Sequence, residues 1–437
     1  MIISNFQNLA KNSLRKKAFL IAEAGYEAID ISRLIYQRVK LKEGQLIVNF
    51  ASIDRSKKLK LNLNDYKRVF LVGIGKGSAL ASAALVKILG DKLSGGIALD
   101  ISNVKCQMSN VKCFQGTHPL PSEQNIKATQ EIIKLAKSLN KNDLLITFIC
   151  GGGSALMCGS EKELKHSQEI FKHLTEAGAD IFGLNTVRKH LSEVKGGGLA
   201  KMAYPAKVVS LIVSDICGND LSFIASGPTV YDETTNKDAE KILKKYDLEP
   251  KKFHFHENLK EKKYFKKVKN ILFVCNQDAI MEMLKKSEEL GFKVKIHSLA
   301  LQGEAGNVLW PMVKKNERGR VILAAGETTV NLKNRPKGKG GRNTEAVLGA
   351  LAKIENLKFK IENSVIMSFT SDGRDNTEAA GAIGDFLTLK NAEKLDINPH
   401  YFLKQNKSFE FFDKTGDLIY AKKRCFNVAD LMIILKA

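Results

Sequence analysis

The chain has 437 residues and a mass of 48.4 kDa, with 44% hydrophobic and 27% charged residues. This length exceeds one ordinary domain, and the apolar share supplies real cores. The sequence therefore predicts a soluble globular protein of two domains, or of one domain with a large insertion. Disordered, collagen-like and disulfide-scaffold classes are excluded by the composition.

The 69 Lys and Arg residues against 47 Asp and Glu leave a net charge of +22, which can indicate a nucleic-acid or membrane-surface partner. Arg supplies only 12 of these cations, and they are scattered through the chain. The one dense cluster, residues 251–269, interleaves eight lysines with Glu257 and Glu261. We therefore interpret the charge as a solvated lysine surface and expect no nucleic-acid partner.

Seven cysteines without a C-x-x-C pair argue against a disulfide framework and a structural zinc site, and favour a reducing cytoplasm. The N-terminus turns polar directly after Phe6 and basic at residues 15–17, which is unlike a signal peptide. The longest apolar runs, such as residues 144–150, are far shorter than a membrane span. We expect a cytoplasmic protein with no membrane partner.

Apolar positions at helical spacing in residues 8–38 predict a long helix or a helix pair. Apolar runs then alternate with segments of helical periodicity, which predicts an α/β fold with parallel strands buried on both faces. The same alternation resumes after a lysine-rich stretch, so we expect domains at 1–248 and 249–437. The expected strands are 68–73, 95–100, 143–149 and 207–213, then 271–275, 292–297, 320–325 and 364–370, and the clearest helices are 122–138 and 161–177.

The first glycine-rich loop, residues 73–78, follows an expected strand and opens a helix. Gly73 and Gly75 let backbone N–H groups face an anion, and Lys76 adds a full positive charge. A dinucleotide fingerprint is the alternative, because Asp100 ends the next strand about 25 residues on, where a ribose-binding acid is expected. A tight bend with a surface lysine also fits this loop.

The second loop, residues 150–156, also follows a strand and contains Gly151, Gly152 and Gly153. Three consecutive glycines cost much chain entropy on folding, so they favour a backbone that lies next to a ligand. Ser154 either caps the following helix or touches a ligand oxygen.

Residues 185–198 read as a helix that ends on a glycine cluster. Arg188 and Lys195 are two helical turns apart and would share one face. In a chain so poor in Arg, Arg188 suggests a planar fork for a carboxylate or phosphate, although a surface cation face is an equal alternative.

Acidic side chains follow two further strands. Asp215 lies at the end of the strand 207–213, and Asp372 follows the strand 364–370. Carboxylates at strand ends beside phosphate loops commonly hold Mg²⁺, although both also fit Asx turns.

The second half adds Glu327 in a Gly-Glu-Thr-Thr-Val segment and a Gly-Gly loop that opens a helix with Arg342 and Asn343. A glycine loop at a helix start, tipped by an arginine, is a second candidate anion site.

Taken together, these motifs closely resemble the class II glycerate 2-kinase family, whose members carry a C-terminal MOFRL domain. The resemblance runs from near residue 15 to the C-terminus and keeps the order of the motifs. They are Gly-x-Gly-Lys at 73–76, Gly-Thr-His-Pro at 116–119, Gly-Gly-Gly-Ser-Ala at 151–155, Asn-x-Val-Arg-Lys-His-Leu-Ser at 185–192, Ala-Ser-Gly-Pro-Thr at 225–229, Gly-Glu-Thr-Thr-Val at 326–330 and Gly-Gly-Arg-Asn at 340–343.

The resemblance implies ATP-dependent phosphorylation of D-glycerate at its 2-hydroxyl group, with Mg²⁺. We expect a monomer or a homodimer. It implies a Rossmann-like N-terminal domain with a parallel sheet, a smaller C-terminal α/β domain with a mixed sheet, and an active site in the cleft between them. The family's proposed catalytic lysine and arginine fall on Lys76 and Arg342. From our own interpretation of the motifs, we assign metal binding to Asp215 and Asp372, and ATP and substrate binding to the glycine loops, Ser154, Arg188, Lys195, Glu327 and Asn343.

We hypothesise that Lys76 and Arg342 neutralise the transferred phosphoryl group and that Arg188 binds the glycerate carboxylate. His118 is either a base or a structural histidine of its loop. The sequence departs from the family at Asn219, which replaces an acid, at the loop 372–377, and at residues 421–426, where a basic segment replaces a glycine-rich one. The rival hypotheses are an NAD-dependent hydroxypyruvate reductase, a kinase for another sugar acid, and an inactive nucleotide-binding relative.

Overall fold

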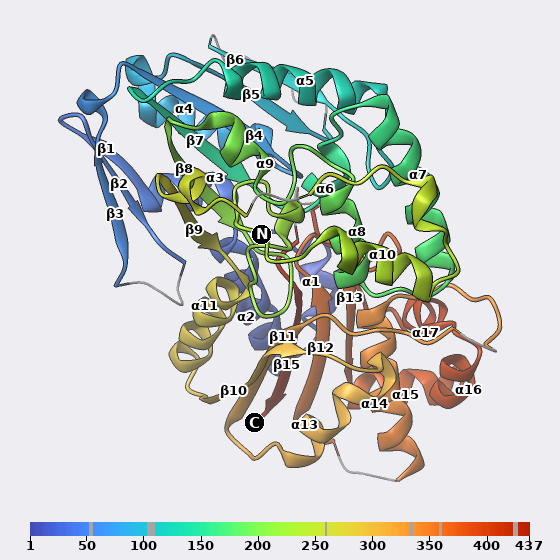
Figure 1. Cartoon of the computed structure of the whole chain (residues 1–437). Coiled ribbons are helices and arrows are strands. Elements are labelled where there is room, and N and C mark those ends of the chain that lie inside the picture. Colours follow the sequence, from blue (N-terminus) through green and yellow to red (C-terminus); the bar gives the residue numbers. More distant parts are fainter. Residues whose placement is uncertain (52–55, 103–109, 258–259, 333–334, 358–360, 423–426) are drawn as a thin grey trace. The chain divides into compact units, whose positions relative to one another are not determined.

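The computed structural model describes the chain except residues 52–55, 103–109, 258–259, 333–334, 358–360 and 423–426 (Figure 1). The chain forms two compact units. The parallel-sheet unit comprises Ile31–Ser214 and Asn219–Val274, and the mixed-sheet unit comprises Met1–Asp30, Asp215–Gly218 and Cys275–Ala437.

This division differs from the expected boundary at 248/249. The strand expected near 271–275 is β9 (Val268–Val274), and it pairs with β8 (Lys207–Val213) in the first sheet. The lysine-rich stretch before β9 therefore marks an exposed connection and not a change of unit, because charge reports solvent exposure and not strand pairing.

The parallel-sheet unit is built on six parallel strands in the order β6-β5-β4-β7-β8-β9. Numbered within the sheet, this is 3-2-1-4-5-6, the Rossmann order. From β4 the chain adds strands toward one edge of the sheet, and from β7 it adds them toward the other edge, so the order of connection reverses between β4 and β7. Ligands of such sheets bind beyond the carboxyl ends of the strands at that reversal. The remaining strands are β4 (Arg68–Ile74), β5 (Gly95–Asp100), β6 (Val111–Gln115) and β7 (Asp143–Ile149).

Helices connect these strands as the sequence periodicity predicts. In α5 (Glu123–Lys137) the buried positions Ala128, Ile132 and Ala136 recur every four residues, so one stripe contacts the sheet. The other helices of this unit are α3 (Ile31–Arg38), α4 (Ser78–Leu89), α6 (Gly153–Leu156), α7 (Glu161–Glu176), α8 (Ile181–His190), α9 (Gly198–Ala203) and α10 (Asn236–Lys245). A separate antiparallel sheet, β1 (Val39–Lys42), β2 (Gln45–Asn49) and β3 (Lys58–Asn62), was not predicted.

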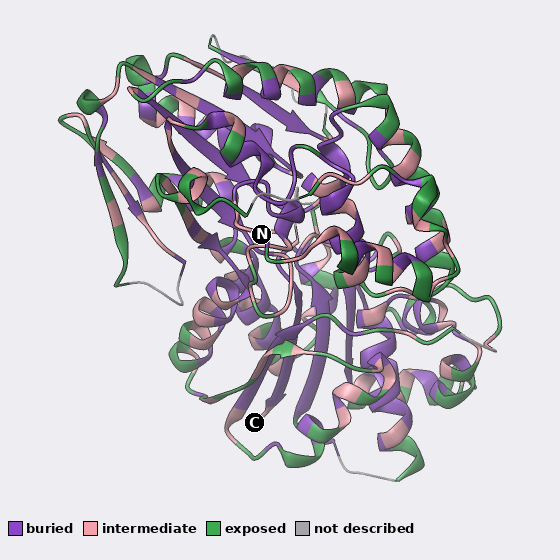
Figure 2. Ribbon diagram, viewed as in Figure 1, coloured by how far each residue is buried: buried purple, intermediate pink, exposed green. Residues whose placement is uncertain are grey.

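Burial on both faces explains why the parallel strands could be predicted from continuous apolar runs in the sequence. Every residue of β7 is buried, as is expected for a central strand covered by helices on both faces (Figure 2). The short antiparallel strands alternate buried and exposed positions over only four or five residues, which is a much weaker signal.

The mixed-sheet unit contains six strands in the order β10-β11-β15-β12-β13-β14. The pair β10 and β11 is parallel, and all the other pairs are antiparallel, so the expected mixed sheet is confirmed. The C-terminal strand lies between β11 and β12, and Asp430 is its first residue. The strands are β10 (Lys293–Leu301), β11 (Arg320–Gly326), β12 (Ser364–Thr370), β13 (Gly381–Asp385), β14 (Leu418–Ile419) and β15 (Asp430–Lys436).

The first 30 residues join this unit through a buried ion cluster. Arg15 is fully buried on α2 and donates to Asp385 Oδ2 at 2.7 Å and to Asp417 Oδ1 at 2.6 Å. The helices are α1 (Phe6–Leu9), α2 (Ser13–Ala28), α11 (Asn276–Glu289), α12 (Ala305–Val308), α13 (Trp310–Lys315), α14 (Arg342–Asn356), α15 (Phe386–Lys394), α16 (Pro399–Lys404) and α17 (Ser408–Thr415).

Within the described residues no helix is both long and apolar enough to span a membrane.

The cysteines differ in part from the expectation that none is paired. Cys150, Cys158, Cys217 and Cys275 are free thiols, but Cys113 is disulfide-bonded. Pairing depends on the distance between two cysteines in the fold, which their spacing in the sequence does not reveal.

Candidate active site

Two glycine loops meet at the reversal point of the parallel sheet. The Lys76 N–H donates to the Gly151 carbonyl at 2.9 Å, and the Cys150 N–H donates to the Ile74 carbonyl at 3.0 Å. Gly75 has a φ of +110°, and a Cβ there would lie 2.4 Å from the Cys150 carbonyl oxygen. Glycine is required at this point because no other residue permits such a close approach.

The Lys76 side chain lies over Gly152. A Cβ on Gly152 would lie 3.1 Å from Lys76 Cγ and 3.3 Å from His118 Cδ2, so the glycine leaves room for both side chains. Among the described residues, the Lys76 ammonium has no hydrogen bond and no ion pair. The pKa of His118 is lowered to about 4 by desolvation and by the charges of Lys76 and Arg188. These three side chains therefore lie within electrostatic range of one another.

Arg188 projects from the last turn of α8, and its guanidinium lies 5.0 Å from the centre of the Phe171 ring. No carboxylate of the described chain pairs with it. Burial lowers its pKa to about 10, so it stays protonated at neutral pH. A partly buried arginine without an acidic partner is suited to a carboxylate or phosphate of a ligand.

The other residues of the two loops mainly serve close packing. A Cβ on Gly73 would lie 2.5 Å from Ser82 Oγ, and one on Gly153 would lie 2.5 Å from Ala225 Cβ. The hydroxyls of Ser154 and Ser226 lie 2.8 Å apart. The N-cap of α6 is Gly152 and not Ser154, so the capping alternative for Ser154 is wrong.

Lys195 does not share a helix with Arg188, contrary to expectation. The helix α8 ends at His190, and the chain then turns before α9. Lys195 is buried, and its ammonium donates to the Met157 carbonyl at 2.7 Å and to Glu163 Oε1 at 2.5 Å. Its charge is thus matched within the protein, which periodicity alone did not reveal.

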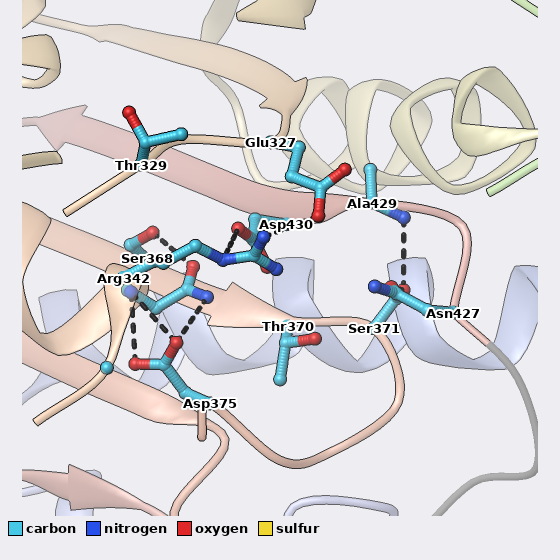
Figure 3. A network of polar contacts seen from close by, with 12 residues as sticks. Glu327, Thr329, Arg342, Ser368, Thr370, Ser371, Asp375, Asn427, Ala429 and Asp430 are labelled. Carbon is cyan, nitrogen blue, oxygen red and sulfur yellow. Dashed lines mark hydrogen bonds and ion pairs between the residues drawn. The ribbon is translucent and has the colours of Figure 1, made fainter. Parts of the chain in front are cut away.

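In the mixed-sheet unit, Arg342 lies between two carboxylates at the carboxyl ends of β11 and β12 (Figure 3). Its Nη1 contacts Glu327 Oε1, and its Nε lies 3.3 Å from Asp430 Oδ2. Burial opposes the charge of Arg342, but the charges of Asp430 and Glu327 outweigh it and raise the pKa of the guanidinium. Arg342 and Glu327, both predicted, are thus brought together, and Asp430 was missed.

Asn343 is buried in the same network. Its Nδ2 donates to Asp375 Oδ1 at 3.1 Å, and its Oδ1 accepts from Ser368 Oγ at 2.6 Å (Figure 3). Asp375 also accepts from the backbone N–H groups of Asn343 and Thr344, which begin α14. Asn343 therefore holds the start of this helix, and Asp375 is a capping residue that the sequence analysis did not single out.

The two predicted metal ligands both belong to the mixed-sheet unit. Asp372 Oδ1 accepts from Thr370 Oγ1 at 3.0 Å and from the Arg374 N–H at 3.1 Å, so it forms the Asx turn named as its alternative. In the part of the chain that the structure describes, no three His, Cys, Asp or Glu side chains are grouped to hold a metal. Neither Asp215 nor Asp372 thus belongs to a preformed metal cage.

The position of Asp100 tests the alternative that the first glycine loop binds a dinucleotide, in which Asp100 would bind the ribose. It is buried, and its carboxylate accepts from the Ala79 N–H at 3.0 Å and from the Ile101 N–H at 2.6 Å. An acid that binds ribose presents its oxygens to the ligand, whereas this one caps the start of α4. The structure therefore disfavours the dinucleotide interpretation of the first loop.

Comparisons with known proteins agree with this geometry. The model described as "Domain of unknown function (DUF4147)" matches residues 17–260, and the model of the MOFRL family matches residues 320–430. A D-glycerate 2-kinase of Thermotoga maritima is 34% identical over 86% of this chain and 91% of its own length. The chain belongs to the glycerate kinase family. A crystal structure of the glycerate kinase from the same organism superposes with a TM-score of 0.82 at 30% identity, covering 97% of this chain and all of that one.

Some relatives carry a different name. A putative hydroxypyruvate reductase of Agrobacterium vitis is 33% identical over 84% of this chain and 87% of its own length. That name corresponds to the reductase alternative, but the capping role of Asp100 weighs against a dinucleotide site in this chain.

Proposed function

We propose that this glycerate kinase family member transfers the γ-phosphoryl group of ATP to the 2-hydroxyl group of D-glycerate, giving 2-phosphoglycerate and ADP. The observation that carries the proposal is the pair of cations Lys76 and Arg188 near the sheet reversal, which have no acidic partner among the described residues. The substrates of this reaction are both anions, which such a site attracts.

The roles follow from charge and position. Lys76 would stabilise the charge on the γ-phosphoryl oxygens, and Arg188 would bind the glycerate carboxylate with its planar fork. The 2-hydroxyl oxygen forms a bond to the γ-phosphorus, and the bond from phosphorus to the β–γ bridging oxygen breaks, with its electron pair staying on ADP. The hydroxyl proton is released to water. His118 stays neutral at pH 7 because of its lowered pKa, so it can accept a hydrogen bond from a substrate hydroxyl.

Arg342 would add a second charge stabiliser, with Glu327 as its ion-pair partner. Mg²⁺ is held in many kinases by one or two carboxylates together with the nucleotide phosphates, and not by a complete protein cage. The described residues fit that mode, with Asp215 and Asp372 as the proposed carboxylates. When bound, the ion would neutralise phosphate charge.

The direct test measures ADP release from Mg·ATP with D-glycerate and identifies the product by ³¹P NMR. We expect 2-phosphoglycerate, and we expect Lys76→Met to lower kcat by about a hundredfold or more while the fold is kept, as loss of one preorganised charge does. A product phosphorylated at the 3-hydroxyl, or turnover only with another hydroxy acid, would overturn the proposed substrate or regiochemistry. NADH oxidation with hydroxypyruvate would instead support the reductase.

Absence of turnover with retained ATP binding would favour an inactive relative. The altered segment 421–426 motivated that alternative, and its residues 423–426 lie outside the described residues. Of the remainder, Ala421 pairs with Ile3, and the Lys422 N–H donates to the Ile2 carbonyl. A variant that restores a Gly-rich sequence at 423–426 would test whether this segment limits turnover.

A further inference from the structure

Asp430 has an unusual environment for a carboxylate. It is 1% exposed, and among the described residues neither of its oxygens accepts a hydrogen bond of normal geometry, because the Asn343 amide nearby donates to Asp375 instead. Its one close charge is Arg342 Nε, 3.3 Å from Oδ2, and this Nε also lacks a hydrogen bond (Figure 3). The contact is therefore electrostatic and is not supported by the directional bonds that normally accompany a buried ion pair.

Two other buried acids of the same unit, Asp385 and Asp375, have hydrogen-bond donors on both carboxylate oxygens. Asp385 accepts two hydrogen bonds from Arg15 and one from the Thr388 N–H. Asp375 accepts from the N–H groups of Asn343 and Thr344. A buried carboxylate without such donors destabilises the folded state, so its presence calls for an explanation other than stability.

Its position suggests that explanation. Asp430 begins β15 between Gly326 of β11 and Thr370 of β12, and it faces the inner side of the Arg342 guanidinium. Glu327, with a half-exposed side chain, contacts the Nη1 end of the same group. At 1% exposure, Asp430 is not accessible to a substrate, and it can act only through Arg342.

We propose that Asp430 is a positioning residue that orients the Arg342 guanidinium for phosphoryl transfer, and that it does so in its ionised form only. This inference rests on the proposed kinase function and on the proposed contact of Arg342 with the transferred group. An arginine held from its buried side keeps its outer nitrogens in a fixed direction, and preorganisation of this kind is what makes a charge effective in the transition state.

The charged and titratable groups that face Asp430 set its protonation. Its pKa is raised to about 7. Burial and the charges of Asp375 and Glu327 raise it, whereas the charge of Arg342 and the Asn343 side chain lower it. The Cys217 thiol also lies within electrostatic range. As the pH falls through 7, Asp430 gains a proton and its attraction for Arg342 is lost. We therefore expect kcat to fall as Asp430 becomes protonated.

The test compares Asp430→Asn with the wild-type enzyme. The amide keeps the shape of the side chain but never ionises. We expect kcat at pH 8 to fall about tenfold or more with KM for D-glycerate within about twofold, because only the transition state is affected. The ratio of wild-type to variant kcat should approach 1 below pH 6 and rise to a plateau above pH 8. Taking the ratio cancels the titration of the nucleotide phosphates.

Stability supplies an independent readout. Because its pKa is raised in the folded protein, Asp430 destabilises the fold above the pKa of the unfolded chain, so Asp430→Asn should keep or raise Tm. Asp385→Asn is the matched control: it removes a buried acid that is hydrogen-bonded to Arg15, and it should lower Tm while the pH profile of kcat is unchanged. A ratio that stays near 1 at every pH, or a kcat loss independent of pH that follows a fall in Tm, would overturn the inference.

The variant Arg342→Met distinguishes failure of the proposed role of Asp430 from failure of the proposed catalytic role of Arg342. If Arg342→Met lowers kcat and Asp430→Asn does not, only the role of Asp430 fails. If Arg342→Met leaves kcat unchanged, the proposed role of Arg342 fails and that of Asp430 with it. In the double variant we expect no loss beyond that of Arg342→Met, because residues that act as a unit are not additive.

Discussion

Lys195→Met tests whether the buried Lys195 ammonium stabilises the folded protein or binds a ligand. The substitution keeps most of the apolar stem and deletes the ammonium that contacts the Met157 carbonyl at 2.7 Å and Glu163 at 2.5 Å. Both ionised side chains are at most 3% exposed. Of the hydrogen bonds in the described structure, the Glu163 carboxylate would keep the one from the Gly159 N–H.

Deleting one partner of a buried ion pair leaves an uncompensated charge, so we expect a loss of about 3–5 kcal/mol in the free energy of unfolding. Urea denaturation followed by circular dichroism measures this loss. The double variant Lys195→Met/Glu163→Gln removes the orphaned charge and should regain about 1–2 kcal/mol relative to the single variant. Kinetics at a temperature where the variants are folded should give KM values within about twofold of the wild-type enzyme.

A binding role for Lys195, as the sequence analysis suggested, makes the opposite prediction. Wild-type stability together with a KM for ATP or D-glycerate raised by about tenfold or more would refute the structural reasoning. That outcome would mean that the Glu163 contact is exchanged for a contact with a ligand during turnover.

Three further predictions concern Arg188, His118 and Arg15. Arg188→Met should raise KM for D-glycerate by about 10–100-fold with little change in Tm, because no acid of the described chain loses a partner; an unchanged KM would exclude Arg188 from the substrate site. His118 should titrate near pH 4 in NMR and stay neutral from pH 6 upward, so that stability falls as the pH drops from 6.5 towards 4; a midpoint near 6.5 would show that Lys76 and Arg188 are distant from it. Arg15→Met should cost about 3–5 kcal/mol by leaving Asp385 buried without its partner, measured by denaturation; a loss below 1 kcal/mol would contradict the anchoring role.

Several parts of the fold were predictable because their signals are local. Strands β4, β5, β7 and β8 are central and buried, so each is a nearly continuous apolar run in the sequence. The glycine loops after β4 and β7 were also visible, since their strand-to-glycine-to-helix order is a short-range pattern. Lys76 and Arg342 were identified through motifs that the chain shares with its family.

Other features depend on residues that are distant in the sequence. The strand β15 was not predicted, although it is apolar, and it inserts between β11 and β12. Arg15 finds its partners at Asp385 and Asp417, about 400 residues away. No periodicity encodes such pairs.

The sequence by itself determined the class of the fold, the α/β alternation and the family, because these depend on local hydrophobic patterns and on the order of short motifs. Tertiary structure decided which charges are free to meet a ligand. Lys76, Arg188 and Lys195 were all predicted to meet a ligand, and only the fold shows that Lys195 is neutralised by Glu163. It also decided that Asp430 is a buried acid beside Arg342 that accepts no hydrogen bond of normal geometry from the described residues. The physical reason is that a charge acquires its function from its neighbours and its solvation, and both are set by packing between distant segments.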